Sequence, residues 1–230
     1  MPNLLNSFGR TKTYVSNDGY IVFESSVPGT YPISLGSGIY HVVLIGGGGG
    51  GAHRFWRYHS PDLARAQGGV GATIDCIVRT EENIIASVVV GAPGETKAII
   101  DQGSATVLGS DGTSTGLYNI QNITLVANNG TGGRISGDTT LVAGVMGAAS
   151  IIGSNILKVT MNSNDNPIVS QASTSYFSPY GAIKNTNYMP NTSLGQGGGS
   201  DMEPLSNPPL YQPGPGYCLI EKIDINLYDL

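Results

Sequence analysis

The residues with the clearest chemical interpretation form an unbroken run of six glycines, Gly46 to Gly51. The run follows the apolar segment His41–Ile45 and satisfies the G-x-G-x-x-G pattern that holds the pyrophosphate of a dinucleotide at the start of a helix. The following residues do not predict a helix, because Pro61 would fall in its interior. Asp75, the candidate ribose ligand, falls inside a predicted strand rather than at its end. Any polyglycine run matches this pattern, so we expect no nucleotide and no cofactor.

Other catalytic motifs lack the structural context that their chemistry needs. Gly112–Gly116 fits the G-x-S-x-G nucleophile elbow, which requires a following helix, but Leu117–Ala127 predicts loop and strand. Asn162–Asn166 offers oxygen ligands to a cation, but it holds one charged residue and favours an Asx-rich turn. The sequence contains no P-loop, H-E-x-x-H or EF-hand pattern, and its 16 acidic residues show no spacing that nominates a glycoside hydrolase. We therefore expect no catalytic residue and no metal site.

Two cysteines, Cys76 and Cys218, each lie inside an apolar stretch. The sequence has no Cys-x-x-Cys pair, and neither cysteine has a histidine close to it. A disulfide framework or a zinc site would need such partners. We predict two buried thiols.

The main candidate for binding is the segment Ala52–Gln67, which glycine tracts flank on both sides. It holds the only tryptophan, three of the six arginines and two of the three histidines. Trp, Tyr and Arg dominate binding energies at interfaces and stack on sugars and aromatic surfaces. Two alternatives stay open: the side chains fold back over the glycine layers, or they contact a neighbouring subunit. We predict a binding loop whose receptor- or partner-binding residues are His53, Arg54, Phe55, Trp56, Arg57, Tyr58 and His59.

A second candidate for binding is the segment Tyr176–Met189. Its content of Tyr, Ser, Gly and Asn is similar to that of antibody paratopes, in which rigid aromatic rings supply area and small polar residues supply hydrogen bonds. The alternative is a plain surface loop or a fibre contact. The residues predicted to bind are Tyr176, Phe177, Tyr180 and Tyr188.

The elements that position these residues are predicted to be short strands. Glycine makes up 34 of 230 residues, about twice the usual share of roughly 7 per cent, and charged residues make up 12 per cent. This composition argues against a helix-rich enzyme, because helices need Ala, Leu, Glu and Lys. It also argues against charge-driven disorder, which needs many charged residues. Asn17–Gly19, Asp111–Gly112 and Asn129–Gly130 predict turns, because Asn, Asp and Gly tolerate positive φ. The predicted strands are Tyr20–Glu24, Tyr31–Leu35, Ile39–Ile45, Ala72–Thr80, Ile84–Val90, Ala105–Leu108, Ile123–Ala127, Ile156–Met161 and Tyr217–Ile225. The fold class is mainly β.

The glycine tracts between these strands either stay loose or are fixed by close backbone packing, because ordering glycine costs much chain entropy. The tracts adjoin strand-like segments, so we predict extended, polyproline-II-like segments that pack backbone to backbone, with long loops projecting from them. A flexible linker is the alternative. The predicted scaffold glycines are Gly46, Gly47, Gly48, Gly49, Gly50, Gly51, Gly68, Gly69, Gly132, Gly133, Gly197, Gly198 and Gly199.

The charge pattern excludes some partners. The net charge is −5, with 11 basic and 16 acidic residues and no run of one sign, so we expect no nucleic acid partner. Apolar runs fall short of the roughly 20 residues that a membrane span needs, and Met1–Arg10 lacks the features of a signal peptide. We expect a protein made in the cytoplasm that does not insert into a membrane.

Several glycine-containing blocks follow one another in a fixed order: Phe23–Leu35, Gly38–Ile45 with the glycine run, Gly69–Thr73, Val88–Gly94, Ser104–Leu108, Leu125–Gly133 and Pro213–Glu221. In this order they resemble the glycine-rich domain of bacteriophage tail and tail-fibre proteins. The resemblance spans about residues 20–133 and 195–223, whereas 134–194 departs from the pattern. It implies a virion component. Some members, the tail-fibre tip adhesins, pack parallel polyglycine helices and carry variable loops that touch the host surface.

These observations lead to one expected function and one alternative. We expect a non-enzymatic virion protein of the tail or tail-fibre apparatus that contributes to host attachment, with residues 1–19 docking onto the particle and 20–230 forming a glycine-rich β domain with a divergent insertion at 134–194. Its expected partners are other virion proteins and a host glycan or outer-membrane protein, and we expect it to be oligomeric in the particle. The alternative is an architectural capsid, neck or baseplate protein without host contact. A glycan hydrolase ranks last, because no carboxylate pair stands out.

Overall fold

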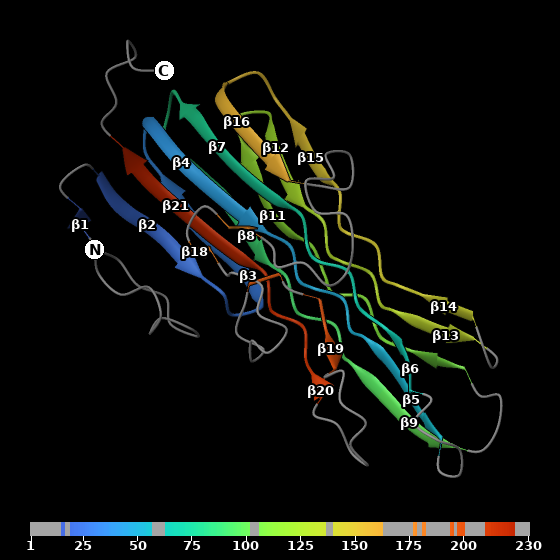
Figure 1. Cartoon of the computed structure of the whole chain (residues 1–230). Helices are drawn as coiled ribbons and strands as arrows, with labels where there is room; N and C mark the ends of the chain where they lie inside the picture. Colours follow the sequence, from blue (N-terminus) through green and yellow to red (C-terminus); the bar gives the residue numbers. More distant parts are fainter. Residues whose placement is uncertain are drawn as a thin grey trace.

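The protein is mainly β, with 56% strand and no helix among the residues that the structure describes. The computed structural model (Figure 1) describes residues 15–16, 19–56, 63–101, 106–136, 140–162, 177–178, 181–182, 194–195, 197–200 and 210–223. It is elongated, with large sheets at one end, small sheets at the other and extended segments between them. The predicted fold class is confirmed at the level of mainly β.

Two large antiparallel sheets form a sandwich. The six-stranded sheet has the order β1 (Val15–Ser16), β2 (Gly19–Ser25), β21 (Tyr217–Ile223), β4 (Gly38–Ile45), β7 (Thr73–Thr80) and β16 (Ile156–Asn162). The five-stranded sheet has the order β15 (Ala149–Ile152), β12 (Ile123–Ala127), β11 (Thr115–Ile120), β8 (Ile84–Val90) and β3 (Gly29–Leu35). Alternate residues such as Ile74, Cys76 and Val78 point into the core between the sheets.

The opposite end of the molecule consists of small sheets, which we call the tip. One sheet has the order β6 (Leu63–Ala66), β5 (Ala52–Trp56) and β9 (Lys97–Asp101), with β5 and β9 parallel. A second has the order β10 (Val107–Leu108), β13 (Arg134–Ser136) and β14 (Thr140–Val142), and β19 (Gly199–Ser200) pairs with β20 (Leu210–Tyr211). A small apolar core of Ala52, Ala66, Val107 and Ile135 joins the two three-stranded sheets. A further pair, β17 (Phe177–Ser178) and β18 (Gly181–Ala182), is antiparallel.

Extended segments form a bundle between the sandwich and the tip (Figure 1). The chain passes from sandwich to tip and back, so that β4 continues through residues 46–51 into β5 and β6 returns through 67–72 into β7. The later bundle segments connect other strands of the sandwich to other strands of the tip in the same way. The segments are 46–51, 67–72, 91–96, 109–114, 128–133, 143–148, 194–195 with 197–198, and 212–216.

The segment 46–51 is the centre of this bundle. The N–H groups of Gly46 and Gly49 donate to carbonyl groups of one neighbour, segment 67–72, at 2.9 and 2.8 Å. Hydrogen-bond partners therefore repeat every three residues, the number of residues per turn of a polyproline II helix. The other N–H and carbonyl groups reach further neighbours. Six segments surround the centre in this order: 67–72, 128–133, 109–114, 91–96, 212–216 and 194–198.

The six surrounding segments form a closed ring, because hydrogen bonds link each of them to the next. Chain direction alternates around the ring, as the order of the strands requires. The N–H groups of Gly46 to Gly50 donate to carbonyl groups of the three antiparallel neighbours, and carbonyl groups of the central segment accept hydrogen bonds from the three parallel ones. The Gly51 N–H donates to the hydroxyl group of Thr96 in a parallel neighbour. The predicted backbone-to-backbone packing of the glycine tracts is thus observed, and the flexible-linker alternative is wrong for 46–51.

Glycine is required in the central segment by space. A Cβ on Gly46, Gly47, Gly49 or Gly50 would collide with a backbone carbonyl of a neighbouring segment, well inside the 3.0 Å limit of real Cβ contacts. None of these residues has φ in the left-handed region. The side-chain hydrogen is therefore needed for close approach and not for an unusual backbone conformation.

The number of glycines in a segment follows its number of hydrogen-bonded neighbours. Within the described bundle, the central segment has six neighbours and six glycines, whereas segment 128–133 has four neighbours and three glycines. Segments 91–96 and 109–114 have three neighbours each and keep two glycines, three residues apart. At the bundle surface, side-chain oxygens replace absent carbonyls, as where the hydroxyl groups of Ser110 and Thr113 accept hydrogen bonds from segment 91–96 at 2.7 Å.

Two of the turn predictions are wrong. Asp111–Gly112 and Asn129–Gly130 lie in extended bundle segments, where their glycines serve close packing. The tight turn of this region connects β11 and β12, where Gln121 and Asn122 have φ of 37° and 70°. The pairing of Ser16 with Gly19 agrees with the turn predicted at Asn17–Gly19, although residues 17 and 18 lie outside the described residues.

Most predicted strands are confirmed, and the errors lie near the glycine tracts. Ile84–Val90 and Ile123–Ala127 are found with the predicted bounds. The predicted loop Ala52–Gln67 instead contains β5 and β6, and the predicted loop after Gly116 is part of β11. Residues 134–162 of the predicted insertion supply β13 to β16 and one bundle segment, so this part is built into the same sheets.

A glycine substitution tests the bundle. Gly49→Ala places a methyl group against the carbonyl of Thr131 with backbone on all sides, so it should destabilise the chain by more than about 4 kcal/mol or prevent soluble folding. Gly36→Ala is the matched control, since its Cβ would meet only side-chain atoms at 3.4 Å or more. Urea unfolding measures both. A Gly49→Ala protein as stable as the native chain would show that the bundle is not packed in this way.

Candidate functional site

The tip is the candidate site, because several chain connections leave its strands. Residues 57–62 connect β5 to β6, 102–105 lead from β9 toward β10, 137–139 connect β13 to β14, and 201–209 connect β19 to β20. These connections lie outside the described residues. The strands that carry them are placed on the far side of the bundle from the sandwich (Figure 1).

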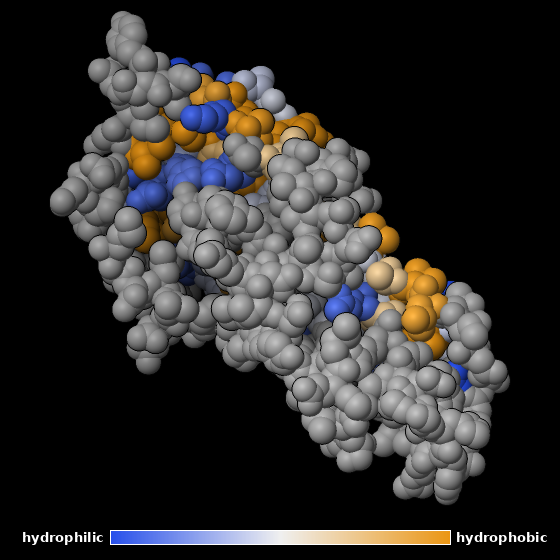
Figure 2. Space-filling view, in the orientation of Figure 1, coloured by the Kyte–Doolittle hydropathy of each residue, from blue (hydrophilic) through white to orange (hydrophobic). Residues whose placement is uncertain are grey.

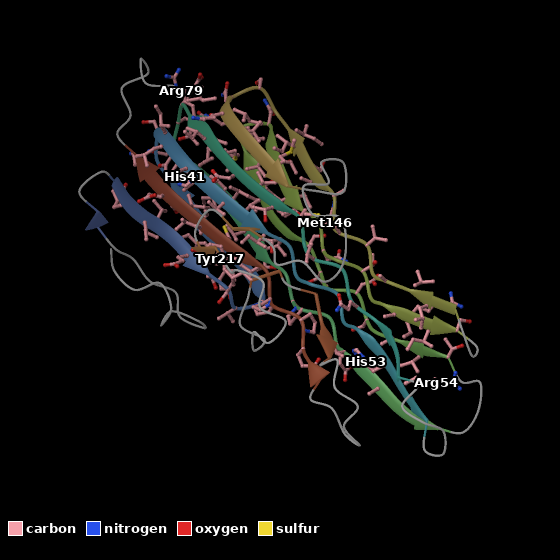
Figure 3. All side chains as sticks on the ribbon, viewed as in Figure 1. His41, His53, Arg54, Arg79, Met146 and Tyr217 are labelled. Carbon is pink, nitrogen blue, oxygen red and sulfur yellow. The ribbon has the colours of Figure 1, made fainter. Side chains whose placement is uncertain are left out.

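The predicted binding residues His53 and Arg54 lie in β5, and the prediction of exposed loop residues is wrong for both. Their side chains are fully buried, and Arg54 is among the largest fully buried side chains of the described chain. The physical reason is that β5 is the middle strand of its sheet and that β10 and β13 pack against it. Figure 3 shows both residues inside the tip. Both side chains lie inside the tip, and their predicted role in binding stays a prediction.

The structure leaves the other predicted binding residues untested. Phe55 and Trp56 end β5, where Trp56 pairs with Asp101 of β9, but their side chains are outside the described residues. Phe177 begins β17, and its side chain is outside as well. The predicted residues that lie wholly outside the described ranges are Arg57, Tyr58, His59, Tyr176, Tyr180 and Tyr188.

The predicted scaffold glycines lie in the bundle or at its end. Gly68 and Gly69 belong to segment 67–72, Gly132 and Gly133 to 128–133, and Gly199 begins β19. A Cβ on Gly68, Gly69, Gly132, Gly133 or Gly197 would collide with backbone of an adjacent segment. These glycines are therefore used to hold the tip at a fixed distance from the sandwich.

The G-x-S-x-G match is not a nucleophile elbow. β11 begins at Thr115 inside the motif and continues to Ile120, where that chemistry needs a helix. The Ser114 hydroxyl donates to the side-chain oxygen of Asn128 at 3.0 Å. Across the described ranges, no group of three His, Cys, Asp or Glu side chains could hold a metal ion. Within these ranges there is also no helix with the length and hydrophobicity that a membrane span requires.

The two cysteines are buried free thiols, as predicted. Burial raises the pKa of Cys76 to about 12, with a smaller contribution from the charge of Asp75. Burial also raises the pKa of Cys218. Thiolates are the reactive form of cysteine, so these side chains are inert packing groups of the sandwich core.

Sequence reasoning missed a charged cluster on the outer face of the six-stranded sheet. His41 of β4 binds Asp75 of β7 through Nε2 at 2.9 Å and lies 3.6 Å from Glu221 of β21 through Nδ1. Register explains the grouping, because Glu221 lies directly opposite His41 and Asp75 lies diagonally across. The signal in the sequence is one polar residue within each of three apolar strands. Only the pairing of the strands shows that these three residues lie together.

A second missed group is the buried pair of Glu24 and Tyr217. The Tyr217 hydroxyl donates to Glu24 Oε1 at 3.0 Å, and both residues are under 7% exposed. Burial raises the pKa of Tyr217, and the adjacent charge of Glu24 raises it further. Tyr217 directly follows the bundle segment 212–216, so the pair holds the point where the bundle enters the sheet (Figure 3).

Removal of the Tyr217 hydroxyl should destabilise the protein. Tyr217→Phe leaves the Glu24 carboxyl buried without this donor, which we expect to cost about 1–3 kcal/mol in urea unfolding. Tyr31→Phe is the control, because its hydroxyl donates to Val27 O at an exposed position, and it should change stability by less than about 0.5 kcal/mol. Equal effects of the two substitutions would contradict the role of the buried pair.

The His41 cluster predicts a pH dependence of stability. Burial lowers the pKa of His41, but the hydrogen bond and charge of Asp75, followed by those of Glu221, outweigh it and raise the pKa above 6.5. A raised folded-state pKa means that protonated His41 stabilises the fold fully below pH 6.5 and that this contribution is lost as pH rises through the folded-state value. Urea unfolding at a series of pH values should show a decrease in the free energy of unfolding of the native chain as pH rises through this range. His41→Gln should lack this decrease. An unchanged pH profile would contradict the prediction.

Comparison with known proteins gives no assignment. A scan against protein-family models and a search of curated proteins both find no match for this chain.

Proposed function

We propose that this chain is a bacteriophage virion protein of the tail or tail-fibre apparatus that contributes to attachment to the host surface. It does so with projecting loops held on a polyglycine, polyproline-II-like scaffold. The observation that carries this proposal is the placement of the strands that flank the connections 57–62, 102–105, 137–139 and 201–209, which all lie at one end of a hydrogen-bonded bundle. Binding residues are commonly carried by loops on a rigid support.

The bundle is suited to act as a stiff support. Backbone hydrogen bonds join the central segment to six neighbours, and close contact leaves no room there for a Cβ on Gly46, Gly47, Gly49 or Gly50. Bending it would break many bonds between polar groups that water does not reach. Loops on this support would bind a surface with a smaller loss of conformational entropy, because the bundle beneath them is already ordered.

The opposite end of the molecule is suited to attachment to the particle. Gly19 of β2 pairs with Ile223 of β21 at the end of the six-stranded sheet that lies away from the bundle. Ser16 pairs with Gly19 at this same end, so the described residues of the proposed docking segment 1–19 lie on the sandwich and not on the tip.

The composition of the tip connections fits recognition of a host glycan or an outer-membrane protein. Residues 57–62 bring Arg57, Tyr58 and His59 next to the end of β5, and Trp56 is the last residue of that strand. Aromatic rings stack on sugar faces, and Arg and His donate hydrogen bonds to hydroxyl or carboxylate groups. Many copies on one particle would give avidity from weak sites. No enzymatic step is proposed.

An architectural role without host contact is the second candidate. It is favoured by exposed apolar residues of the tip and of the bundle segment next to it, namely Leu141, Val142 and Val145, which are 48–50% exposed. They belong to β14 and the adjoining segment, where the surface is hydrophobic (Figure 2). A neighbouring virion protein would cover such a surface.

Cell binding tests the proposal. Fluorescently labelled chain is incubated with a panel of bacterial strains, beside a Phe55→Ala, Trp56→Ala, Arg57→Ala variant. We expect the native chain to bind at least one strain and the variant to lose at least about 10-fold in binding, because such anchors each contribute over 1 kcal/mol.

A matched control separates the two candidates. Leu141→Ala, Val142→Ala, Val145→Ala changes the exposed apolar surface and should leave cell binding unchanged. Folding of all variants is checked by circular dichroism. If no strain binds the native chain while virions containing the loop variant assemble and infect normally, attachment through this loop is contradicted. Loss of assembly in the apolar variant would favour the architectural role.

A further inference from the structure

The outer face of the five-stranded sheet is a broad surface that no described element covers. Registers place the outward positions of β3, β8, β11, β12 and β15 side by side, as in the pairs Ser34 with Ile85 and Thr124 with Ile152. Ile85 is 73% exposed and Ile152 is 63% exposed. Val89, Tyr118 and Val126 lie between them and are partly exposed.

None of the outward positions on these strands is charged. They are occupied by Thr, Pro, Ser, Ile, Val, Gly and Tyr. Exposed protein surfaces usually carry about 25–35% charged residues, and the cores of interfaces are depleted of charge. The inner face of the same sheet already packs in the sandwich core, so its outward side chains serve no internal packing.

The face is flat at its centre. A Cβ on Gly116 of β11 would fall on the ring of Tyr118, so this ring lies back along the strand over the glycine. Val89 of β8 and Val126 of β12 flank Gly116 directly across the strands. An aromatic ring that lies flat between two valines makes a low surface against which a second sheet can pack at about 10 Å.

We infer that two copies of this chain associate through this face. Each copy has a net charge of −5, so two copies repel one another in most orientations. At a face without charged residues, two copies can make contact without placing carboxylates opposite one another. A second copy presents the same uncharged surface in return, as a two-fold interface requires.

The size of the face is sufficient. Five strands about 4.8 Å apart and about six residues long, at roughly 3.3 Å per residue, cover about 500 Å² in projection. Two such faces together bury about 1,000 Å² or more, the area at which specific interfaces begin. The interface is on the sandwich, so both tips stay free. This inference goes beyond the proposed function and does not depend on it.

Sedimentation equilibrium of the purified full chain tests the inference. We expect a dimer at about 10 μM and at least about a 100-fold weaker dimer for Ile85→Glu, Ile152→Glu, because a two-fold interface would bury four added carboxylates. Val145→Glu is the matched control, since Val145 is 48% exposed on the bundle and lies off this face. Circular dichroism and urea unfolding confirm that the variants are folded.

Two results would overturn the inference. One is a native chain that stays monomeric up to about 100 μM, a concentration at which a specific interface of this size would be populated. The other is a dimer that Ile85→Glu, Ile152→Glu leaves intact while Val145→Glu dissociates it, which would assign contact between copies to the bundle surface. Since the readout is mass and not cell binding, it is independent of whether the tip attaches to a host.

Discussion

The structure depends on one constraint, which is that the N–H and carbonyl groups of the buried segment 46–51 must find partners in a bundle packed too closely for Cβ atoms. Six neighbouring segments supply these partners through N–H to carbonyl bonds of 2.8–3.0 Å, and the Gly51 N–H donates to the Thr96 hydroxyl group. Close approach in turn excludes Cβ atoms, which makes glycine obligatory at Gly46, Gly47, Gly49 and Gly50. Hydrogen bonding and residue size are therefore two aspects of a single packing problem.

This constraint links the two ends of the molecule. The sandwich is held by an apolar core, and the described side chains of the tip form a second core of Ala52, Ala66, Val107 and Ile135. Each bundle segment continues directly into a strand of the tip. The hydrogen bonds between bundle segments therefore fix the spacing and register at which the tip strands begin.

Residue patterns predicted the sandwich well and the tip poorly. Alternation in Ile74, Cys76 and Val78 reports a half-buried strand, which depends on local sequence alone. Asp111–Gly112 and Asn129–Gly130 carry turn chemistry but lie in straight segments, because packing against neighbours distant in sequence decides their conformation. The burial of His53 and Arg54 likewise follows from the parallel pairing of β5 with β9, which no local pattern reveals. Close packing of the glycine tracts could be predicted, but their six-fold arrangement could not.

Each N–H group from Gly46 to Gly50 donates to a backbone carbonyl of a neighbouring bundle segment. Native-state amide hydrogen exchange of Gly46 to Gly50, followed by NMR on the intact protein, measures this directly, because each amide reports one bond to a known neighbour. We predict exchange as slow as that of the sandwich core strands, limited by global unfolding. Exchange at rates close to those of an open chain would contradict the account, since the segment would then be a loose linker.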